Sequence, residues 1–546
     1  MKTVGAILEL VFSGLCLVLC GASADPTAIS HPAACPNENG YVMTKQGCVQ
    51  GDIVDGVSVF KGIPFAAPPI GNLRWKEPVT LAVRSTILET RKFSARCMQP
   101  VVPLQRSPSP LSEDCLYLNI WTPAKFRTKM ALPVMVYVHG GGNTTGSASE
   151  TPGQGNLFLY DGQQLAKRGH VIVVTIQYRL NVFGYLVHPA LDAESGHKTS
   201  GDYGLLDQIA AFHWVKNNIE FFGGDPSHVL LFGESGGGAD VCALVASPLA
   251  KGLFSSAIME SGGCEARSKA EMQAWSAGLI TSADCAGAAD PIACLRGKNA
   301  ADLIKRFGLT ATQPGGKIVV MSGPTVDGYV LPQSPVDALR TGQFNHVPFV
   351  MGVNAQETSS PLFRIPDSVT EGEYATFVRA QLPGEADKVL EHYPAKNYVS
   401  PRFALVAITT DYQFICPTRR YLEFAAPAQK EPVYGYLYAH IMEGGPVRLS
   451  GAMHGLELYF VFQTMDLLRP YAPSESDRRL EKIVLGYWTQ FAATGDPNGG
   501  GLANWAPFNL SAKNYLDLSA TPKAAAPLGA EQCDFWNSLA PPGRVH

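Results

Sequence analysis

Short apolar runs, each followed by glycine or a polar turn, recur along the chain and predict β-strands. Examples lie at 132–139, 171–176, 229–234 and 347–354. Segments with a helix-forming pattern, such as 205–215, lie between such runs, and no internal repeat or low-complexity block interrupts them. Strands that alternate with helices favour helical crossovers onto a mostly parallel sheet. The pattern therefore predicts an α/β fold.

The run at 229–234 leads into Gly233-Glu-Ser-Gly-Gly237, and a helix-forming segment follows at 239–246. A G-x-S-x-G turn between a strand and a helix is a nucleophile elbow, whose strained backbone exposes the serine hydroxyl above the sheet. Gly233 and Gly237 are small because strand and helix nearly touch at this corner. The context predicts Ser235 as a nucleophile.

A serine hydroxyl needs a base, a carboxylate that orients the base, and donors for the oxyanion. The strand at 132–139 ends in His139, which we expect to be structural, and runs into the glycine triplet 140–142. Glycine lets the backbone approach a substrate without a Cβ in the way. We therefore expect the oxyanion donors to be the amides of Gly141, Gly142 and Gly236.

The base and the acid are expected further along the chain. His454 precedes a glycine and stands before an apolar run, whereas His440 lies in a tyrosine-rich apolar segment and is expected to be packed and hydrogen-bonded. Glu357 follows the strand at 347–354 and is the predicted acid. Other carboxylates remain open for that role: Asp327, Glu371 and Glu373.

These segments resemble the type-B carboxylesterase/lipase family, the relatives of cholinesterases. The similarity extends from about Val54 nearly to the C-terminus. It includes the segments 59–75, 112–121, 201–208, 222–226, 323–332 and 533–537. The resemblance implies an α/β-hydrolase fold with a mostly parallel central sheet flanked by helices. It also implies the triad Ser235, Glu357 and His454, in the chain order that α/β-hydrolases use. Glu234 resembles the family's carboxylate that supports the triad without touching the substrate, and the alternative is a buried glutamate that only holds local backbone.

The chain departs from the family pattern near the glycine triplet and the triad. Asn143 stands where an aromatic residue is usual, Gly236 where alanine is usual, and Thr358 where glycine is common. No tryptophan lies between Cys97 and Cys115, where cholinesterases place the aromatic residue that binds choline. We expect Asn143 to border the bound substrate and to favour esters with polar or carboxylated groups. Choline esters are expected to be poor substrates.

Length and composition agree with one large enzyme domain. The chain has 546 residues, of which 46% are hydrophobic, and a formal net charge of -4 leaves no basic surface for nucleic acid. No Cys/His spacing resembles a metal site, and no phosphate-binding glycine loop precedes a Lys-Ser/Thr pair. We expect a small-molecule ester as the partner and no metal or cofactor. The oligomeric state is open.

The N-terminus is typical of an export signal. Lys2 precedes a long apolar stretch that ends in Ala22-Ser-Ala24, which suits cleavage before Asp25. An uncleaved anchor is an alternative, and acylation of Cys20 is disfavoured by the bulky Leu19 before it. We expect a cleaved signal at 1–24, a single catalytic domain at 25–546, no stable membrane insertion, and secretion to the cell exterior or periplasm.

Cysteine usage favours an oxidising compartment. Removal of Cys16 and Cys20 with the signal leaves ten of the twelve cysteines. The resemblance implies the pairs Cys97 with Cys115, Cys285 with Cys294, and Cys416 with Cys533. Cys35 and Cys48 flank an N-terminal extension, 35–48, that has no match in the family core, and we expect them to pair with each other. That leaves Cys242 and Cys264, and whether they are free buried thiols is open.

Two classes of function fit the resemblance. The first is a secreted serine esterase that works through an acyl-enzyme. The second is a cholinesterase-like adhesion or binding protein that has lost its catalytic residues. Because Ser235, Glu357, His454 and the oxyanion glycines are all present, we predict the esterase. A serine carboxypeptidase shares a Gly-Glu-Ser elbow, but the segments at 59–75 and 112–121 do not suit it.

Overall fold

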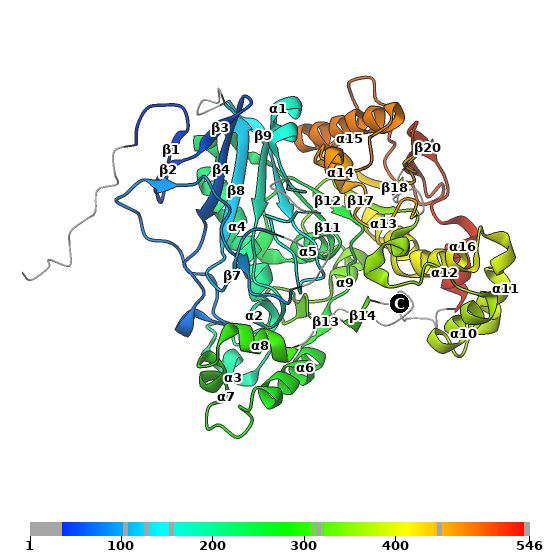
Figure 1. Cartoon of the computed structure of the whole chain (residues 1–546), viewed down its shortest axis with the longest axis horizontal. Helices are drawn as coiled ribbons and strands as arrows, with labels where there is room; N and C mark the ends of the chain where they lie inside the picture. The colour runs from blue at the N-terminus through cyan, green and yellow to red at the C-terminus, as the bar shows by residue number, and fades with distance from the viewer. Residues whose placement is uncertain are drawn as a thin grey trace, which may run out of the picture.

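An eleven-stranded sheet organises the chain, in the order β20-β19-β18-β17-β12-β11-β9-β10-β8-β4-β3 (Figure 1). Its strands, in chain order, are β3 (Asp52–Val54), β4 (Val57–Pro64), β8 (Tyr117–Pro123), β9 (Leu132–Val138), β10 (Ile172–Ile176), β11 (Gly224–Glu234), β12 (Ser256–Glu260), β17 (Phe349–Asn354), β18 (Val433–Tyr438), β19 (Tyr515–Leu518) and β20 (Lys523–Ala525). The computed structural model describes residues 35–101, 107–124, 130–151, 158–307, 311–312, 318–319, 322–444 and 450–539. The predicted signal at 1–24 lies outside these ranges.

The middle of the sheet is parallel and its edges are antiparallel. Strands β10, β9, β11, β12, β17, β18 and β19 pair in parallel, whereas β8, β4, β3 and β20 join antiparallel. The apolar runs that predicted strands form β9, β10, β11 and β17. The prediction of a mostly parallel sheet is confirmed.

Helices cover both faces of the sheet because successive side chains of a strand point to opposite faces. On β9, Val134, Val136 and Val138 pack in a core that includes residues of α4 and α5. Met135 and Tyr137, between them, pack in a second core with residues of α1 and α15. β9 is therefore apolar along its whole length.

The helices differ widely in length, and the two longest, α15 and α4, pack against the large sheet. They are α1 (Gln163–Gly169), α2 (Asn181–Tyr185), α3 (Pro189–Glu194), α4 (Tyr203–Asn218), α5 (Gly236–Ala246), α6 (Lys269–Ser282), α7 (Pro291–Arg296), α8 (Ala300–Phe307), α9 (Pro335–Thr341), α10 (Glu371–Gln381), α11 (Ala386–His392), α12 (Pro401–Thr410), α13 (Cys416–Ala428), α14 (Leu458–Val461), α15 (Glu475–Thr494) and α16 (Ala530–Leu539). Helices α6, α7 and α8 gather in a lobe at the bottom of Figure 1. None of the helices within the described ranges combines the length and apolarity needed to cross a bilayer.

The N-terminal extension belongs to a small second sheet, of order β1-β2-β5. Strands β1 (Tyr41–Thr44) and β2 (Gly47–Gln50) make a hairpin, and β5 (Leu88–Glu89) pairs with β2. The predicted Cys35–Cys48 disulfide closes this unit.

Five disulfides crosslink the described chain. The other predicted pairs, Cys97–Cys115, Cys285–Cys294 and Cys416–Cys533, are all formed. Cys242 and Cys264, for which the sequence left the state open, are not free thiols, because they form a fifth disulfide with a Cα–Cα distance of 5.4 Å. Helix α5 packs against β12, so Cys242 on the helix meets Cys264 in the loop that follows the strand. The even number of cysteines left after signal removal was the available indication.

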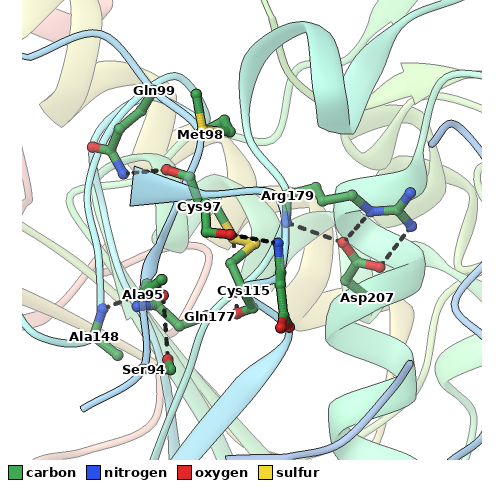
Figure 2. Close-up of a disulfide and its surroundings, with 12 residues drawn as sticks. Ser94, Ala95, Cys97, Met98, Gln99, Cys115, Ala148, Gln177, Arg179 and Asp207 are labelled. Carbon is green, nitrogen blue, oxygen red and sulfur yellow. Dashed lines mark hydrogen bonds and ion pairs between the residues drawn. A yellow bond between two sulfur atoms is a disulfide. The ribbon is translucent and has the colours of Figure 1, made fainter. Parts of the chain in front are cut away.

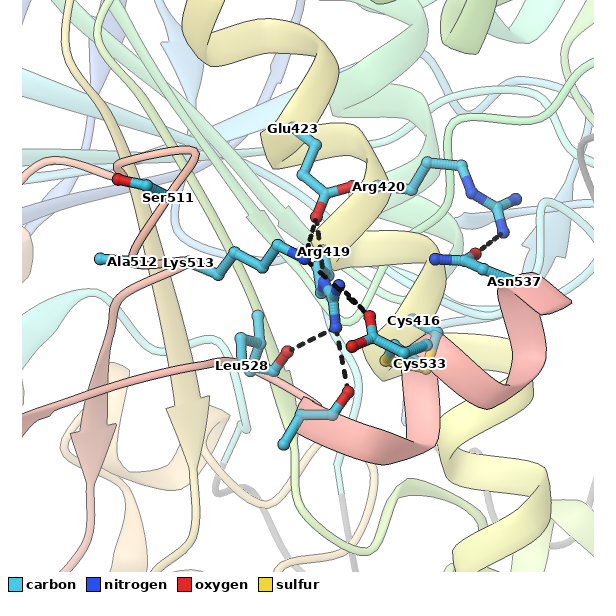
Figure 3. Close-up of polar contacts among 12 residues, drawn as sticks. Cys416, Arg419, Arg420, Glu423, Ser511, Ala512, Lys513, Leu528, Cys533 and Asn537 are labelled. Atoms are coloured by element: carbon cyan, nitrogen blue, oxygen red, sulfur yellow. Dashed lines mark hydrogen bonds and ion pairs between the residues drawn. A yellow bond between two sulfur atoms is a disulfide. The ribbon is translucent and has the colours of Figure 1, made fainter.

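The C-terminal helix α16 is anchored to α13 by charge as well as by Cys416–Cys533 (Figure 3). Arg419 of α13 donates to Glu423 on its own helix at 3.0 Å and to Asp534 on α16 at 2.5 Å. It also donates to the carbonyl oxygens of Leu528 and Ala530. The guanidinium therefore holds together the end of the chain and the helix beside it.

Candidate active site

The predicted nucleophile elbow lies where β11 meets α5. Ser235 has φ 58° and ψ -122°, a conformation that L-residues rarely adopt, and it is half-buried. Its N–H donates to the carbonyl of Glu260 on the neighbouring strand β12 at 2.9 Å. A Cβ on Gly237 would come within 2.1 Å of the Val138 carbonyl oxygen, so this corner requires glycine.

His454 and Glu357 meet beside the elbow. The Nδ1 atom of His454 lies 2.6 Å from Oε2 of Glu357, and the His454 N–H donates to the Glu357 carbonyl at 3.2 Å. The other carboxylate oxygen of Glu357 accepts from the N–H of Asn354 at 2.7 Å. Phe363 and Phe414 pack around the imidazole at centroid distances of 5.6 and 5.4 Å. These contacts fix the ring with Nδ1 toward the carboxylate and leave Nε2 for another partner.

The other ring nitrogen faces the residue that precedes the nucleophile. His454 Nε2 lies 3.1 Å from Glu234 Oε1, although neither atom has a well-aligned hydrogen-bond partner in the described ranges. Burial opposes a charge on His454, but the carboxylates of Glu234 and Glu357 outweigh it and raise the pKa of the imidazole. Burial also raises the pKa of Glu234. The three side chains are thus electrostatically coupled.

Sequence reasoning missed two more buried carboxylates near this site. Glu457 accepts from the Asn354 side-chain amide, and burial raises its pKa well above the ordinary value. Glu260 accepts from Trp488 Nε1 at 2.8 Å, and burial raises its pKa to about 8. Their partners come from distant parts of the chain, so no local motif marks them.

The alternative acids lie elsewhere. Asp327 accepts from the backbone N–H groups of Tyr329 and Leu331, and Glu371 and Glu373 are exposed at the start of α10. The other two histidines are structural, as expected. His139 is buried and stacks on Tyr178, and burial lowers its pKa to about 4. His440 is buried against Asp477 at 2.6 Å.

The glycine loop lies against the first turn of α5. Gly141 has φ 107° and Gly142 has φ 59°, values that favour glycine. A Cβ on Gly236 would come within 2.6 Å of the Gly142 nitrogen, which accounts for glycine at 236. Within the described residues, the amides of Gly141, Gly142 and Gly236 donate to no protein acceptor. Three backbone donors are therefore available to an anion, and Gly142 lies against Gly236, the residue that follows Ser235.

Asn143 was expected to border the substrate. Its backbone adjoins Gly142, but its side chain is buried and its amide is engaged internally. Nδ2 donates to Asp240 Oδ1 at 2.8 Å, and Oδ1 accepts from the Tyr185 hydroxyl at 3.0 Å. Because both polar atoms of the amide have partners inside the protein, this arrangement does not favour contact between the Asn143 side chain and an ester. That contact stays a prediction.

The rest of the glycine loop is tied to the Cys97–Cys115 region (Figure 2). Gln99 donates to the Gly146 carbonyl at 2.8 Å and accepts from its N–H at 2.9 Å. Beside it, Arg179 makes a buried ion pair with Asp207 of α4, in which both carboxylate oxygens accept at 2.7 Å. The two hydrogen bonds of Gln99 thus tie the glycine loop to the segment that contains Cys97.

The described residues contain no group of three or more His, Cys, Asp or Glu side chains that could hold a metal ion. A strained serine, a histidine backed by a carboxylate and free backbone donors are the components of acyl transfer.

Comparison with known proteins agrees with this geometry. The model of the carboxylesterase family matches residues 38–536. Liver carboxylesterase 1F of Rattus norvegicus is 34% identical over 553 residues, covering 93% of this chain and 94% of the relative. The liver carboxylesterase of Sus scrofa is 34% identical over 571 residues, covering 96% of each. Fumonisin B1 esterase of Sphingopyxis macrogoltabida is 36% identical over 476 residues, covering 85% of this chain and 84% of the relative.

The match spans nearly the whole described chain and includes the elbow, the glycine loop and the segments with Glu357 and His454. The chain therefore belongs to the carboxylesterase family of α/β-hydrolases and is a carboxylic ester hydrolase.

Proposed function

We propose that this hydrolase cleaves esters through a Ser235–His454–Glu357 triad and an acyl-enzyme. The observation that carries the proposal is the placement of His454, with Nδ1 2.6 Å from Glu357 and Nε2 beside Glu234, the neighbour of Ser235. A histidine whose Nδ1 donates to a carboxylate has Nε2 free to accept a proton on the serine side of the site when the ring is neutral.

In the first half-reaction Ser235 Oγ attacks the ester carbonyl carbon and His454 Nε2 takes the hydroxyl proton. The carbonyl oxygen becomes an oxyanion that accepts from the amides of Gly141, Gly142 and Gly236. The intermediate then collapses, the C–O bond to the alcohol breaks, and the alcohol leaves with the proton from His454. The acyl group remains on Ser235.

In the second half-reaction water replaces the alcohol. His454 removes a proton from water as its oxygen attacks the acyl carbon, and the second tetrahedral intermediate collapses to the acid. The proton returns to Ser235 Oγ. Glu357 orients the imidazole and stabilises its charged form in both halves. The cycle needs only water as co-reactant.

For the substrate we propose bulky or polar esters rather than choline esters. The described loop between Cys97 and Cys115 lacks tryptophan. The relative named fumonisin B1 esterase suggests fumonisin B1 as one compound to include in a substrate panel. We also propose cleavage of a signal at 1–24, a single domain over 25–546 and secretion; five disulfides are typical of proteins that fold in an oxidising compartment.

The test is hydrolysis by the purified chain of a panel containing a simple short-chain ester, a polycarboxylic ester, fumonisin B1 and a choline ester. Ser235→Ala is the control on every substrate. We expect hydrolysis by the wild type, loss of it in Ser235→Ala, and the lowest kcat/KM with the choline ester. A wild-type chain inactive on the whole panel would favour the binding-protein alternative, and a choline ester among the best substrates would overturn the substrate proposal.

A further inference from the structure

The side chain of Asn143 bridges the glycine loop and the helix behind the nucleophile. Asn143 Nδ2 donates to Oδ1 of Asp240 at 2.8 Å, and Asp240 lies on α5 beyond Ser235. The two residues are 2% and 0% exposed, respectively. The contact joins the two elements that carry the proposed oxyanion donors, Gly141 and Gly142 on one side and Gly236 on the other.

Asp240 is a costly residue to bury. Its second oxygen accepts from Gln208 Nε2 at 2.6 Å, and no cation lies within ion-pair distance among the described residues. Burial raises the pKa of Asp240 to about 7, although the hydrogen bonds from Asn143 and Gln208 lower it. An acid buried against neutral amides destabilises the fold more than a neutral side chain of similar shape. Folding alone therefore does not account for it.

The backbone around this contact is packed closely enough to transmit a small movement. A Cβ on Gly236 would meet the nitrogens of Gly142 and Asn143 at 2.6 and 3.0 Å. The Asn143 carbonyl accepts from the Asn181 N–H at 2.7 Å and from Ser322 Oγ at 3.2 Å. Asn143 is thus held by both its main chain and its side chain, and the amide of Gly142 precedes it directly.

We propose that Asn143 and Asp240 form a positioning pair, which sets the separation between the glycine loop and α5 and so aligns the Gly142 and Gly236 amides on the substrate oxyanion. The inference rests on the proposed function, because it assigns the pair to that oxyanion hole. Neither side chain touches the substrate. Since stabilisation of an oxyanion depends on donor geometry, a small displacement lowers turnover more than it weakens substrate binding.

The pair can be tested by exchanging its two groups. Asn143→Asp sets two carboxyl groups against each other, and Asp240→Asn leaves an amide facing the Gln208 amide. The double variant restores one carboxylate and one amide, with Tyr185 and Gln208 still able to donate. We expect Asn143→Asp to lower kcat by about 100-fold and to change KM less than about threefold. The kcat of the double variant should be at least about tenfold higher than that of Asn143→Asp.

A second readout separates alignment from folding. A trifluoromethyl ketone adds Ser235 Oγ to its carbonyl carbon, passes the serine proton to His454 and places an alkoxide in the hole, whereas the matching methyl ketone stays trigonal. We expect Asn143→Asp to lower the affinity for the trifluoromethyl ketone by about the same factor as it lowers kcat/KM. The affinity for the methyl ketone should stay unchanged. If Asn143→Asp does not fold, Asn143→Ala is measured in the same way.

The matched control is Ser247→Ala, which removes a buried hydrogen bond to the Val330 carbonyl at the far end of α5. It should lower the melting temperature and leave kcat unchanged. The proposal is overturned if the double variant recovers no activity, or if Asn143→Asp lowers the affinities for the two ketones equally. It is also overturned if Ser247→Ala lowers kcat as much as Asn143→Asp does. Ser235→Ala separates a failure of the proposed triad from a failure of the positioning pair. Activity in Ser235→Ala overturns the triad, and the pair with it. An inactive Ser235→Ala together with a failed exchange overturns only the pair.

Discussion

His454 Nδ1 and Glu357 Oε2 lie 2.6 Å apart although 97 residues separate them in the chain. Glu357 follows strand β17 and His454 precedes helix α14, so the contact forms only when the sheet and its covering helices are assembled. Both side chains are buried. A histidine held in this way has one ring orientation, which matters for a general base.

The proposed triad acts as a unit, so removal of the nucleophile or the base should abolish most of the catalysis. We expect Ser235→Ala and His454→Ala each to lower kcat by about 10⁶-fold, and their combination to cost little more than either alone. Initial rates on a simple ester, with melting temperature as the check on folding, measure this. Independent, multiplying losses in the double variant would contradict the triad.

Glu357 orients the base, so its replacement should leave more residual activity than the replacement of Ser235 or His454. We expect Glu357→Gln to lower kcat by roughly 10⁴-fold, because the amide can donate to Nδ1 and so favour the wrong tautomer. Glu373→Gln, at an exposed position that caps α10, is the matched control and should leave kcat unchanged. Equal activities of the two variants would show that Glu357 is not the acid of the triad.

The pH dependence follows from the raised pKa of His454. Burial lowers this pKa, but the carboxylates of Glu234 and Glu357 outweigh burial and raise it above the ordinary ~6.5. Since the base acts when neutral, kcat/KM should fall as pH decreases through a midpoint above ~6.5. Glu234→Gln removes one negative charge next to Nε2 and should move the midpoint to lower pH. A rate profile that stays flat well into acid, or a midpoint that rises in Glu234→Gln, would contradict the assignment.

The Cys242–Cys264 disulfide should contribute to stability. It closes a loop with a sequence separation of 22, for which the loop-entropy treatment gives about 3 kcal/mol. We expect the Cys242→Ala/Cys264→Ala variant to lose about that amount in denaturant unfolding. Thiol titration of the unfolded, unreduced protein should find no free cysteine among the described ten, and two reactive thiols would show that the pair is not formed.

The sequence was most informative where chemistry and local structure coincide. Gly233 and Gly237 flank the nucleophile within one turn, so the elbow could be predicted without knowledge of the fold. The pairing of Cys242 with Cys264 could not, because it depends on how α5 packs against β12. The same holds for Asp240, Glu260 and Glu457, whose burial and partners arise only when distant segments meet.

The direction of the Asn143 side chain could not be predicted from its neighbours in the sequence. Its position beside Gly142 suggested contact with the substrate, but the direction of its side chain depends on Asp240 and Tyr185. Those two partners belong to α5 and α2, and no spacing in the sequence links them to the glycine triplet.

The central claim is that Ser235 carries the acyl group during turnover. The most direct measurement is mass spectrometry of the protein quenched in acid during steady-state hydrolysis, followed by digestion and location of the added acyl mass. We expect the acyl mass on the peptide that contains Ser235, at that residue, and no adduct in Ser235→Ala. An acyl group found on another residue, or undiminished hydrolysis by Ser235→Ala, would contradict the account.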